Sequence, residues 1–462
     1  MSALGTEAAA LARWSDAQRL SALKRIIPRR AVTSVLRETG KDRSYCKCLP
    51  AWFMVWFVIA IGLFCSDCYR QVYRWLMHWS NQRPVPLRST LCEARQRLGA
   101  RAVALLQRRT CNLLADPQHL PQGFYRGLRL MALDGFTLDL PDTPANDRAF
   151  GRPGTARAAG AFPQARVLAL CEAGTHVLWR TLIKGYHVGE NAMAPYLLRQ
   201  LQAGMLLLWD RNFLKYDHVK LVQAAGAHLL ARVKAGQLVL QPIRRLSDGS
   251  YLSKIYRCPY DRRHDHNGIV VRIIEYTLSD PKRLGHQEKH RLLTTLLDPK
   301  LDPAQTLVEL YHVRWEQELA IDELKTHQME RPVLRSQIPA GVIQEIYGLL
   351  LAHFVLRTLM YEAAQLAPAT EPPVTPLRLS FTGTLKILRC RLPEFPSATG
   401  QQRQWWHDLL REIAQETIEP RRKRINPRVI KRKMSNWKKK RPQHRHYPQP
   451  TKEFRDSIVI LR

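Results

Sequence analysis

The rhythm of hydrophobic and polar positions changes near residue 127. Before it, the apolar positions favour helices, including the almost wholly apolar run 49–64. A membrane-spanning helix needs about 20 such residues, so we expect this run to be a buried helix of a globular domain. A second helix is expected at 89–99, with Arg95 and Arg97 exposed. It is either suited to docking on DNA or simply solvated.

After residue 127 the pattern predicts strands, because short apolar or alternating runs are bounded by turn residues. Strands are expected at 128–135, continued by 136–140, and at 165–171, 176–183, 205–210 and 228–233. Helices are expected at about 190–202 and from about 214 to 225. Three antiparallel strands followed by helix, strand, helix and strand predict an α/β ribonuclease H-like core with a mixed five-stranded sheet.

The rest of the chain divides into an insertion, two helices and a basic end. Residues 236–300 carry β-like runs at 268–278 and 290–297, and helices are expected at 311–325 and 342–367. Four prolines in 368–376 indicate a linker. We therefore expect three parts: an all-helical amino-terminal domain (1–118), an α/β domain carrying the β-rich insertion (119–367), and a linker with a basic carboxy-terminal region (368–462).

Charge changes the picture more than composition does. The 462-residue chain has a formal net charge of +33. Such an excess repels itself unless a polyanion shares the surface, so nucleic acid is the first partner to consider and an anionic membrane the second. Residues 421–441 contain 12 Lys and Arg and no acidic residue, which favours contact with phosphates over a merely solvated tail.

The nine cysteines are scattered and odd in number, which is typical of a reducing cytoplasm rather than a disulfide framework. The amino-terminal sequence lacks the pattern of a signal peptide. Two close pairs, Cys46 with Cys48 and Cys65 with Cys68, could indicate zinc. Their spacing encloses a whole buried helix, so free thiols are the default interpretation.

Three carboxylates stand out by position. Asp134 and Asp210 each end an apolar strand and precede a sharp break, and Glu318 lies on the expected helix 311–325. At about 100° per residue, that helix places four polar residues within roughly 60° on one face: Tyr311, Arg314, Glu318 and Lys325.

The plain alternative is turn residues and surface ion pairs. Converging carboxylates repel one another unless cations neutralise them, and Mg²⁺ or Mn²⁺ suits an all-carboxylate site. Two such ions would support phosphoryl transfer, and the basic neighbours would hold phosphates. Four other carboxylates compete for these roles, of which the last shares the face of Glu318 and is the main rival: Asp139, Asp142, Asp147 and Asp322.

The spacing Tyr-x2-Arg-x3-Glu-x6-Lys at 311–325 resembles the YREK signature of DDE transposases of the insertion-sequence 4 type. The resemblance extends over about residues 20–390 and includes five further stretches: 49–99, 133–143, 209–213, 335–339 and 344–347. It implies that Asp134, Asp210 and Glu318 bind two Mg²⁺ ions, which Mn²⁺ can replace. It also implies that Tyr311, Arg314 and Lys325 grip phosphates of the transposon end.

The resemblance implies a bacterial, nucleoid-associated enzyme without a membrane anchor. A homodimer would pair two ends of double-stranded DNA, with the amino-terminal domain reading terminal inverted repeats. The enzyme would nick the ends, pass through a hairpin and join the 3′ ends to target DNA. A domesticated, inactive relative that only binds DNA is the alternative. The insertion lacks the Trp that stacks a flipped base in hairpin-forming relatives, and four tyrosines are candidate substitutes: Tyr251, Tyr256, Tyr260 and Tyr276.

Overall fold

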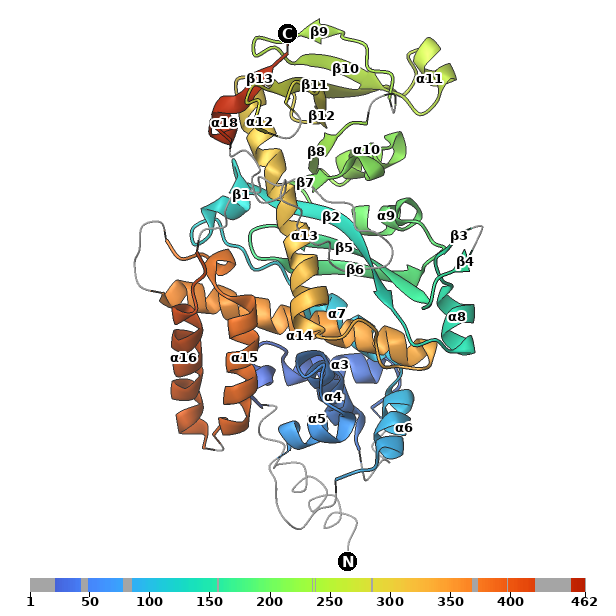
Figure 1. Cartoon of the computed structure of the whole chain (residues 1–462), viewed down its shortest axis with the longest axis vertical. Coiled ribbons are helices and arrows are strands. Elements are labelled where there is room, and N and C mark those ends of the chain that lie inside the picture. Colours follow the sequence, from blue (N-terminus) through green and yellow to red (C-terminus); the bar gives the residue numbers. More distant parts are fainter. Residues whose placement is uncertain are drawn as a thin grey trace, which may run out of the picture. The chain divides into compact units, whose positions relative to one another are not determined.

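A computed structural model describes most of the chain as two compact units (Figure 1). Unit 1 comprises Met1–Leu197 and Glu316–Glu419, and unit 2 comprises Leu198–Trp315 and Pro420–Arg462. The described residues are 21–42, 49–77, 85–155, 158–234, 236, 238–283, 286–367, 373–396, 398–419 and 450–461. The basic run 421–441 and the pair Cys46 and Cys48 lie outside them.

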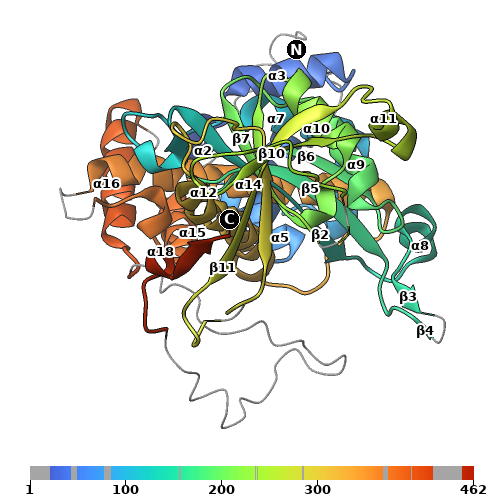
Figure 2. The same ribbon diagram turned by 90° about the horizontal axis from the view of Figure 1, so that it is seen from above.

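Unit 1 contains an antiparallel sheet in the order β6-β5-β2-β1. Its strands are β1 (Phe124–Tyr125), β2 (Leu128–Asp139), β5 (Gln164–Glu172) and β6 (Val177–Gly185). The three predicted strands are confirmed, and the stretches 128–135 and 136–140 form one strand, β2. In Figure 2, α8 (Pro144–Phe150) lies near the short hairpin of β3 (Gly154–Thr155) and β4 (Ala158–Ala159). The helix α9 (Glu190–Leu198) follows β6.

The amino-terminal part of unit 1 is helical, as predicted. Its helices are α2 (Ser21–Lys24), α3 (Arg29–Glu38), α4 (Ala51–Leu63), α5 (Tyr69–Leu76), α6 (Arg88–Leu98) and α7 (Ala100–Thr110). The apolar run expected as a buried helix is α4, which is buried from Phe53 onward. Two glycines allow its backbone to approach another helix, since a Cβ on Gly62 would stand 2.6 Å from the carbonyl oxygen of Gly348.

That second helix is α14 (Pro339–Leu366), the predicted long buried helix. Among the described residues it is the one helix long and apolar enough to cross a membrane, yet 72% of its most apolar window is buried. This is the burial of a core helix. Beyond the expected linker, α15 (Phe381–Arg391) and α16 (Thr399–Gln415) pack against α14 and each other (Figure 1). These two helices were not among the predicted elements.

Unit 2 has a sheet in the order β7-β8-β12-β11-β10-β9, and β13 pairs with the end of β11 (Figure 1). Only β7 and β8 are parallel among these described strands. The strands are β7 (Met205–Trp209), β8 (His228–Arg232), β9 (Arg244–Arg245), β10 (Tyr251–Ile255), β11 (Ile269–Leu278), β12 (His290–Thr294) and β13 (Ile458–Ile460). The helices are α10 (Tyr216–Ala224), α11 (Pro259–Arg263), α12 (Ala304–Tyr311) and α18 (Phe454–Ser457).

The predicted fold class is confirmed. A helical amino-terminal region precedes an α/β, ribonuclease H-like core with sheet and covering helices, and the expected insertion is β-rich, with strands β9 to β12.

Candidate active site

Asp134 lies in the middle of β2 rather than at a strand end. Its Cα partner in β5 is Ala169, and its Oδ1 accepts a hydrogen bond from the backbone N–H of Gly135 at 2.8 Å. Side chains alternate between the faces of a strand, so Asp134 shares a face with Phe136 and Leu138. Gly135 serves the opposite face, where a Cβ would stand 2.5 Å from Oε1 of Glu190.

The helix α13 (Trp315–Asp322) packs on the face that carries Asp134 (Figure 1). Ala320 and Leu324 share a buried cluster with Phe136 and Leu138. Gln317 Nε2 donates to the carbonyl oxygen of Ala169 at 2.9 Å.

Ala169 is the residue paired with Asp134, and Gln317 immediately precedes Glu318. Unit 1 therefore brings α13 over the sheet at the level of Asp134. Both Asp134 and Glu318 are half-buried there.

The stretch 311–325 is helical but not one regular α-helix, so that prediction is wrong in detail. After α12, residues His312–Arg314 form the 3₁₀ turn η4, and after α13 residues Glu323–Gln328 form a π-helix, η5. The residue-by-residue rotation of an ideal α-helix therefore does not hold across the whole signature. Lys325 lies in the π-helix and is exposed, near Asp139 and Asp322. Partial burial lowers the pKa of Lys325, and the two carboxylates act against this change.

The four rival carboxylates already have partners. Arg152 bonds Asp142 at 2.7 Å and Asp147 at 2.8 Å. Gln164 Nε2 donates to Asp139 at 2.7 Å. Asp322 is exposed, accepts from the Thr326 hydroxyl at 2.6 Å, and lies 3.5 Å from His327 Nε2.

Unit 2 holds Asp210 directly after β7. Asp210 caps the 3₁₀ turn η3 (Arg211–Phe213), where its Oδ1 accepts from the backbone N–H of Arg211 at 2.7 Å. Tyr311 is buried, and its hydroxyl donates to the carbonyl oxygen of Trp209 at 3.2 Å. Burial raises the pKa of Tyr311, the nearby Arg314 opposes this change, and Asp210 adds to it. Tyr311 thus supports the strand end that carries Asp210.

Cations gather around this strand end. The Arg314 guanidinium lies 5.9 Å from the centre of the Tyr311 ring. Arg232, which ends β8, was not among the predicted site residues. Because its neighbour Ala231 pairs with Trp209, Arg232 is level with Asp210 in a parallel pair. Only the parallel register of β7 and β8 places Arg232 beside Asp210, and the sequence pattern does not give that register. Arg232 Nη2 also lies 3.2 Å from His290 Nδ1.

The helix α6 corrects the expectation for one arginine. Arg97 is exposed as expected, but Arg95 is buried. Arg95 Nε donates to Gln344 Oε1 at 2.8 Å, and its other nitrogens bond Tyr69, Ser336 and the carbonyl oxygen of Gly341. Arg95 therefore docks α6 on α14.

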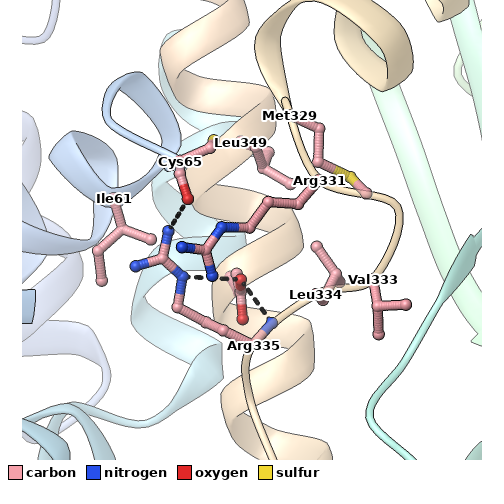
Figure 3. Close-up of a pocket in the computed structure, with 9 residues that line it drawn as sticks. Ile61, Cys65, Met329, Arg331, Val333, Leu334, Arg335 and Leu349 are labelled. Carbon is pink, nitrogen blue, oxygen red and sulfur yellow. Dashed lines mark hydrogen bonds and ion pairs between the residues drawn. The ribbon is translucent and has the colours of Figure 1, made fainter. Parts of the chain in front are cut away.

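The stretches 335–339 and 344–347 contact each other through Arg335 and Glu345. Arg335 bonds the carbonyl oxygens of Cys65 and Asp67 beyond α4, and its backbone N–H donates to Glu345 of α14 at 3.1 Å (Figure 3). The cavity beside it, lined also by Ile61 and Leu349, has room for about one water molecule at roughly 10 Å³. The cavity is a small gap in the packing between helices, not a ligand site.

The cysteines give no support for zinc within the described residues. Cys65 is buried, donates to the carbonyl oxygen of Gly62 at 3.3 Å, and has a pKa raised by burial to about 12. Cys68 is exposed. Within the described ranges, no three His, Cys, Asp or Glu side chains are gathered so that they could hold a metal ion.

The chemistry of the candidate carboxylates suits a hard divalent cation. Asp134 and Glu318 are half-buried oxygen donors, and unit 1 brings their segments to one sheet face. Asp210, the third predicted carboxylate, belongs to unit 2. Carboxylate oxygens are the ligands that Mg²⁺ and Mn²⁺ prefer. Asp134 and Glu318 are therefore oxygen donors of the type that such an ion uses, although the described residues contain no gathered group of three ligands.

Comparison with known proteins identifies the family of the chain. Residues 17–108 match the family of the insertion element 4 transposase N-terminal region, and residues 125–355, half of the chain, match the transposase DDE domain family. Transposase InsG for insertion sequence element IS4 from Escherichia coli is 29% identical over 416 residues, 88% of this chain and 90% of that protein. A piggyBac transposase solved in a synaptic complex with hairpin DNA is similar at a TM-score of 0.42, with 10% identity over 85% of each chain. The two family matches together show that this chain belongs to the DDE transposases of the insertion-element 4 type.

Proposed function

We propose that this transposase cuts an insertion sequence at its terminal inverted repeats and joins the freed 3′ ends to target DNA. The carrying observation is the contact from Gln317 to Ala169, which seats the helix of Glu318 on the sheet at the level of Asp134. Asp134, Asp210 and Glu318 would hold two Mg²⁺ ions, which Mn²⁺ can replace. When bound, such ions stabilise negative charge that develops at the phosphate in phosphoryl transfer.

The basic residues of the signature would hold the DNA end. Arg314, beside Tyr311 in unit 2, has a planar guanidinium suited to two phosphate oxygens. Lys325 is exposed and offers a point charge. Tyr311 donates its hydroxyl hydrogen to Trp209, so a direct phosphate contact would require that bond to open. In the arrangement seen here, Tyr311 acts on the placement of Asp210.

Cut-and-paste through a hairpin is the route we propose. Water would nick the end, and the released 3′ hydroxyl would attack the opposite strand. Of the four candidate tyrosines, Tyr251 and Tyr276 are buried, and Tyr256 donates to Asp265 at 2.7 Å. Tyr260 on α11 is 57% exposed, with the His264 ring 4.2 Å away. It is therefore the tyrosine best placed to stack on a base.

The wider assignment keeps the division made from the sequence. Residues 1–118 would read the element's ends, 119–367 would catalyse with the insertion 236–300, and 368–462 would add a linker and a basic region for phosphates. Two copies would form a homodimer that pairs two double-stranded ends. The protein would work in the bacterial cytoplasm at the nucleoid, without a membrane anchor.

The test uses the purified full chain and linear DNA bearing the element's own ends. We expect nicks and strand transfer with Mg²⁺ or Mn²⁺ and none with EDTA. Glu318→Gln should abolish cleavage while end binding persists. The matched control is Asp322→Asn, one turn further on α13, whose carboxylate is bonded to Thr326. Cleavage that survives Glu318→Gln would overturn the proposal, and loss of cleavage in the control would move the ligand role to Asp322.

A further inference from the structure

A buried histidine lies beneath the segment that carries Glu318. His176 follows the turn after β5, has a left-handed backbone (φ 60°), and its side chain is fully buried. Its Nε2 lies 2.9 Å from Oε2 of Glu316, and its Nδ1 lies 2.9 Å from Oε1 of Glu323. One imidazole therefore bridges two carboxylates on either side of Glu318 in sequence. Both contacts are satisfied when each ring nitrogen carries a hydrogen.

The bridge continues into α14. Arg357 Nη1 lies 3.6 Å from Glu323, and His353 Nε2 lies 3.5 Å from the same carboxylate. Arg357 Nε donates to the carbonyl oxygen of Thr175, next to His176, at 2.6 Å. Burial alone would raise the pKa of Glu323, but Arg357 and His176 hold it well below its usual value. The hairpin turn, the segment of Glu318 and the core helix thus form one ionic network.

The two carboxylates held by His176, Glu316 and Glu323, are the anchors of α13. Their spacing limits the rotation of α13 about its own axis. At about 100° and 1.5 Å per residue, Glu316 and Glu323 fall within about 20° of each other, about 10 Å apart along the axis. A rotation of about 20° would displace a side-chain head by about 2 Å at the helix surface. Two anchors above one another on the buried side oppose such a rotation.

Net stability does not account for this network. A buried ion network is often no more stabilising than apolar side chains of the same volume, and α13 also packs on an apolar cluster through Ala320. The charged groups instead fix the orientation of the helix, because hydrogen bonds form only over a narrow range of distances and angles. The π-helix η5 also begins at Glu323, so the second anchor stands where the helix changes register.

We propose that His176 is a positioning residue for Glu318: by bridging Glu316 and Glu323, it fixes the rotation of α13 on the sheet face that carries Asp134. The inference rests on the proposed role of Glu318. The His176 side chain is fully buried. Its effect passes through the placement of the helix.

The experiment compares His176→Ala with His176→Gln in the full chain. Cleavage of end-bearing DNA is followed against Mg²⁺ concentration, and hydrogen–deuterium exchange is measured on peptides covering 315–328. We expect His176→Ala to cut about 10- to 100-fold more slowly and to need more Mg²⁺, with end binding unchanged. Exchange should quicken in 315–328. Gln can donate to one carboxylate, so His176→Gln should recover part of the rate.

The control for general destabilisation is Leu106→Ala, a buried position of α7. It should lower stability without raising the Mg²⁺ requirement. If His176→Ala fails to fold, Glu316→Gln replaces one partner by a neutral amide of the same shape and should show the same Mg²⁺ and exchange changes.

Unchanged cleavage and exchange in a folded variant would overturn the positioning role, as would behaviour identical to Leu106→Ala. Cleavage by Glu318→Gln would instead overturn the proposed function itself.

Discussion

Glu318 in unit 1 and Arg314 in unit 2 stand four residues apart, yet their surroundings differ in charge. Around α13 the buried partners are carboxylates and the groups that hold them, with His176 between Glu316 and Glu323. In unit 2, the cations Arg232, Arg283 and Arg314 all act on His312. We propose that the end of this stretch with Glu318 binds metal and that the end with Arg314 binds phosphate. The residues of the YREK signature therefore do not form one helix face with a single charge environment.

The largest effect is expected from removing a carboxylate of the predicted metal site. Asp134→Asn should slow cleavage by about 10³-fold or more, because metal ions stabilise the transition state by several kcal/mol. The measurement is single-turnover nicking of end-bearing DNA. Asp142→Asn is the control, since Arg152 already binds that carboxylate. Equal losses in both variants would remove the distinction drawn between them.

Arg314→Ala tests the basic side. We expect cleavage about 10- to 100-fold slower, because a hydrogen bond to a charged group is lost. End binding should weaken, and the slope of log affinity against log salt should fall by about one. Asp134→Asn should leave that slope unchanged. A slope that responds to the aspartate and not to the arginine would reverse the comparison.

Tyr311→Phe tests how Tyr311 connects Arg314 to the strand end that carries Asp210. It removes the bond to Trp209 but keeps the ring against Arg314. The lost bond is worth about 1 kcal/mol, so we expect about fivefold slower cleavage with little change in salt dependence. A full loss of end binding would show that the hydroxyl meets DNA directly.

The smallest effect is on stability. Burial, with Arg283 and Arg314 nearby, lowers the pKa of His312 to about 4. The unfolded chain then binds the extra proton first, so stability is complete above about pH 6.5 and falls as pH drops towards 4.

The His312 side chain is exposed enough for solvent screening, so we expect a loss of only about 1 kcal/mol. Urea unfolding at pH 7 and pH 5 measures this loss. His312→Phe, which keeps a ring beside Phe454, should reduce the difference.

Regular elements of this fold were predictable because their signals are local. The apolar runs of β7 and β8 and the uniform burial of α4 leave direct traces in residue order. The stretch 311–325 was predicted as a regular helix because helix propensity carries no signal for a 3₁₀ turn or a π-helix. Arg95 was placed at the surface by its charge, whereas four partners on distant elements bury it.

The sequence by itself determined the candidate carboxylates, the basic residues beside Glu318 and the family resemblance, because these depend on residue types at set spacings. Only the tertiary structure decided which groups surround them. Arg232 is level with Asp210 through a parallel strand register, and His176 meets Glu316 and Glu323 from 140 and 147 residues away. No local pattern records such pairings, because chain folding creates them.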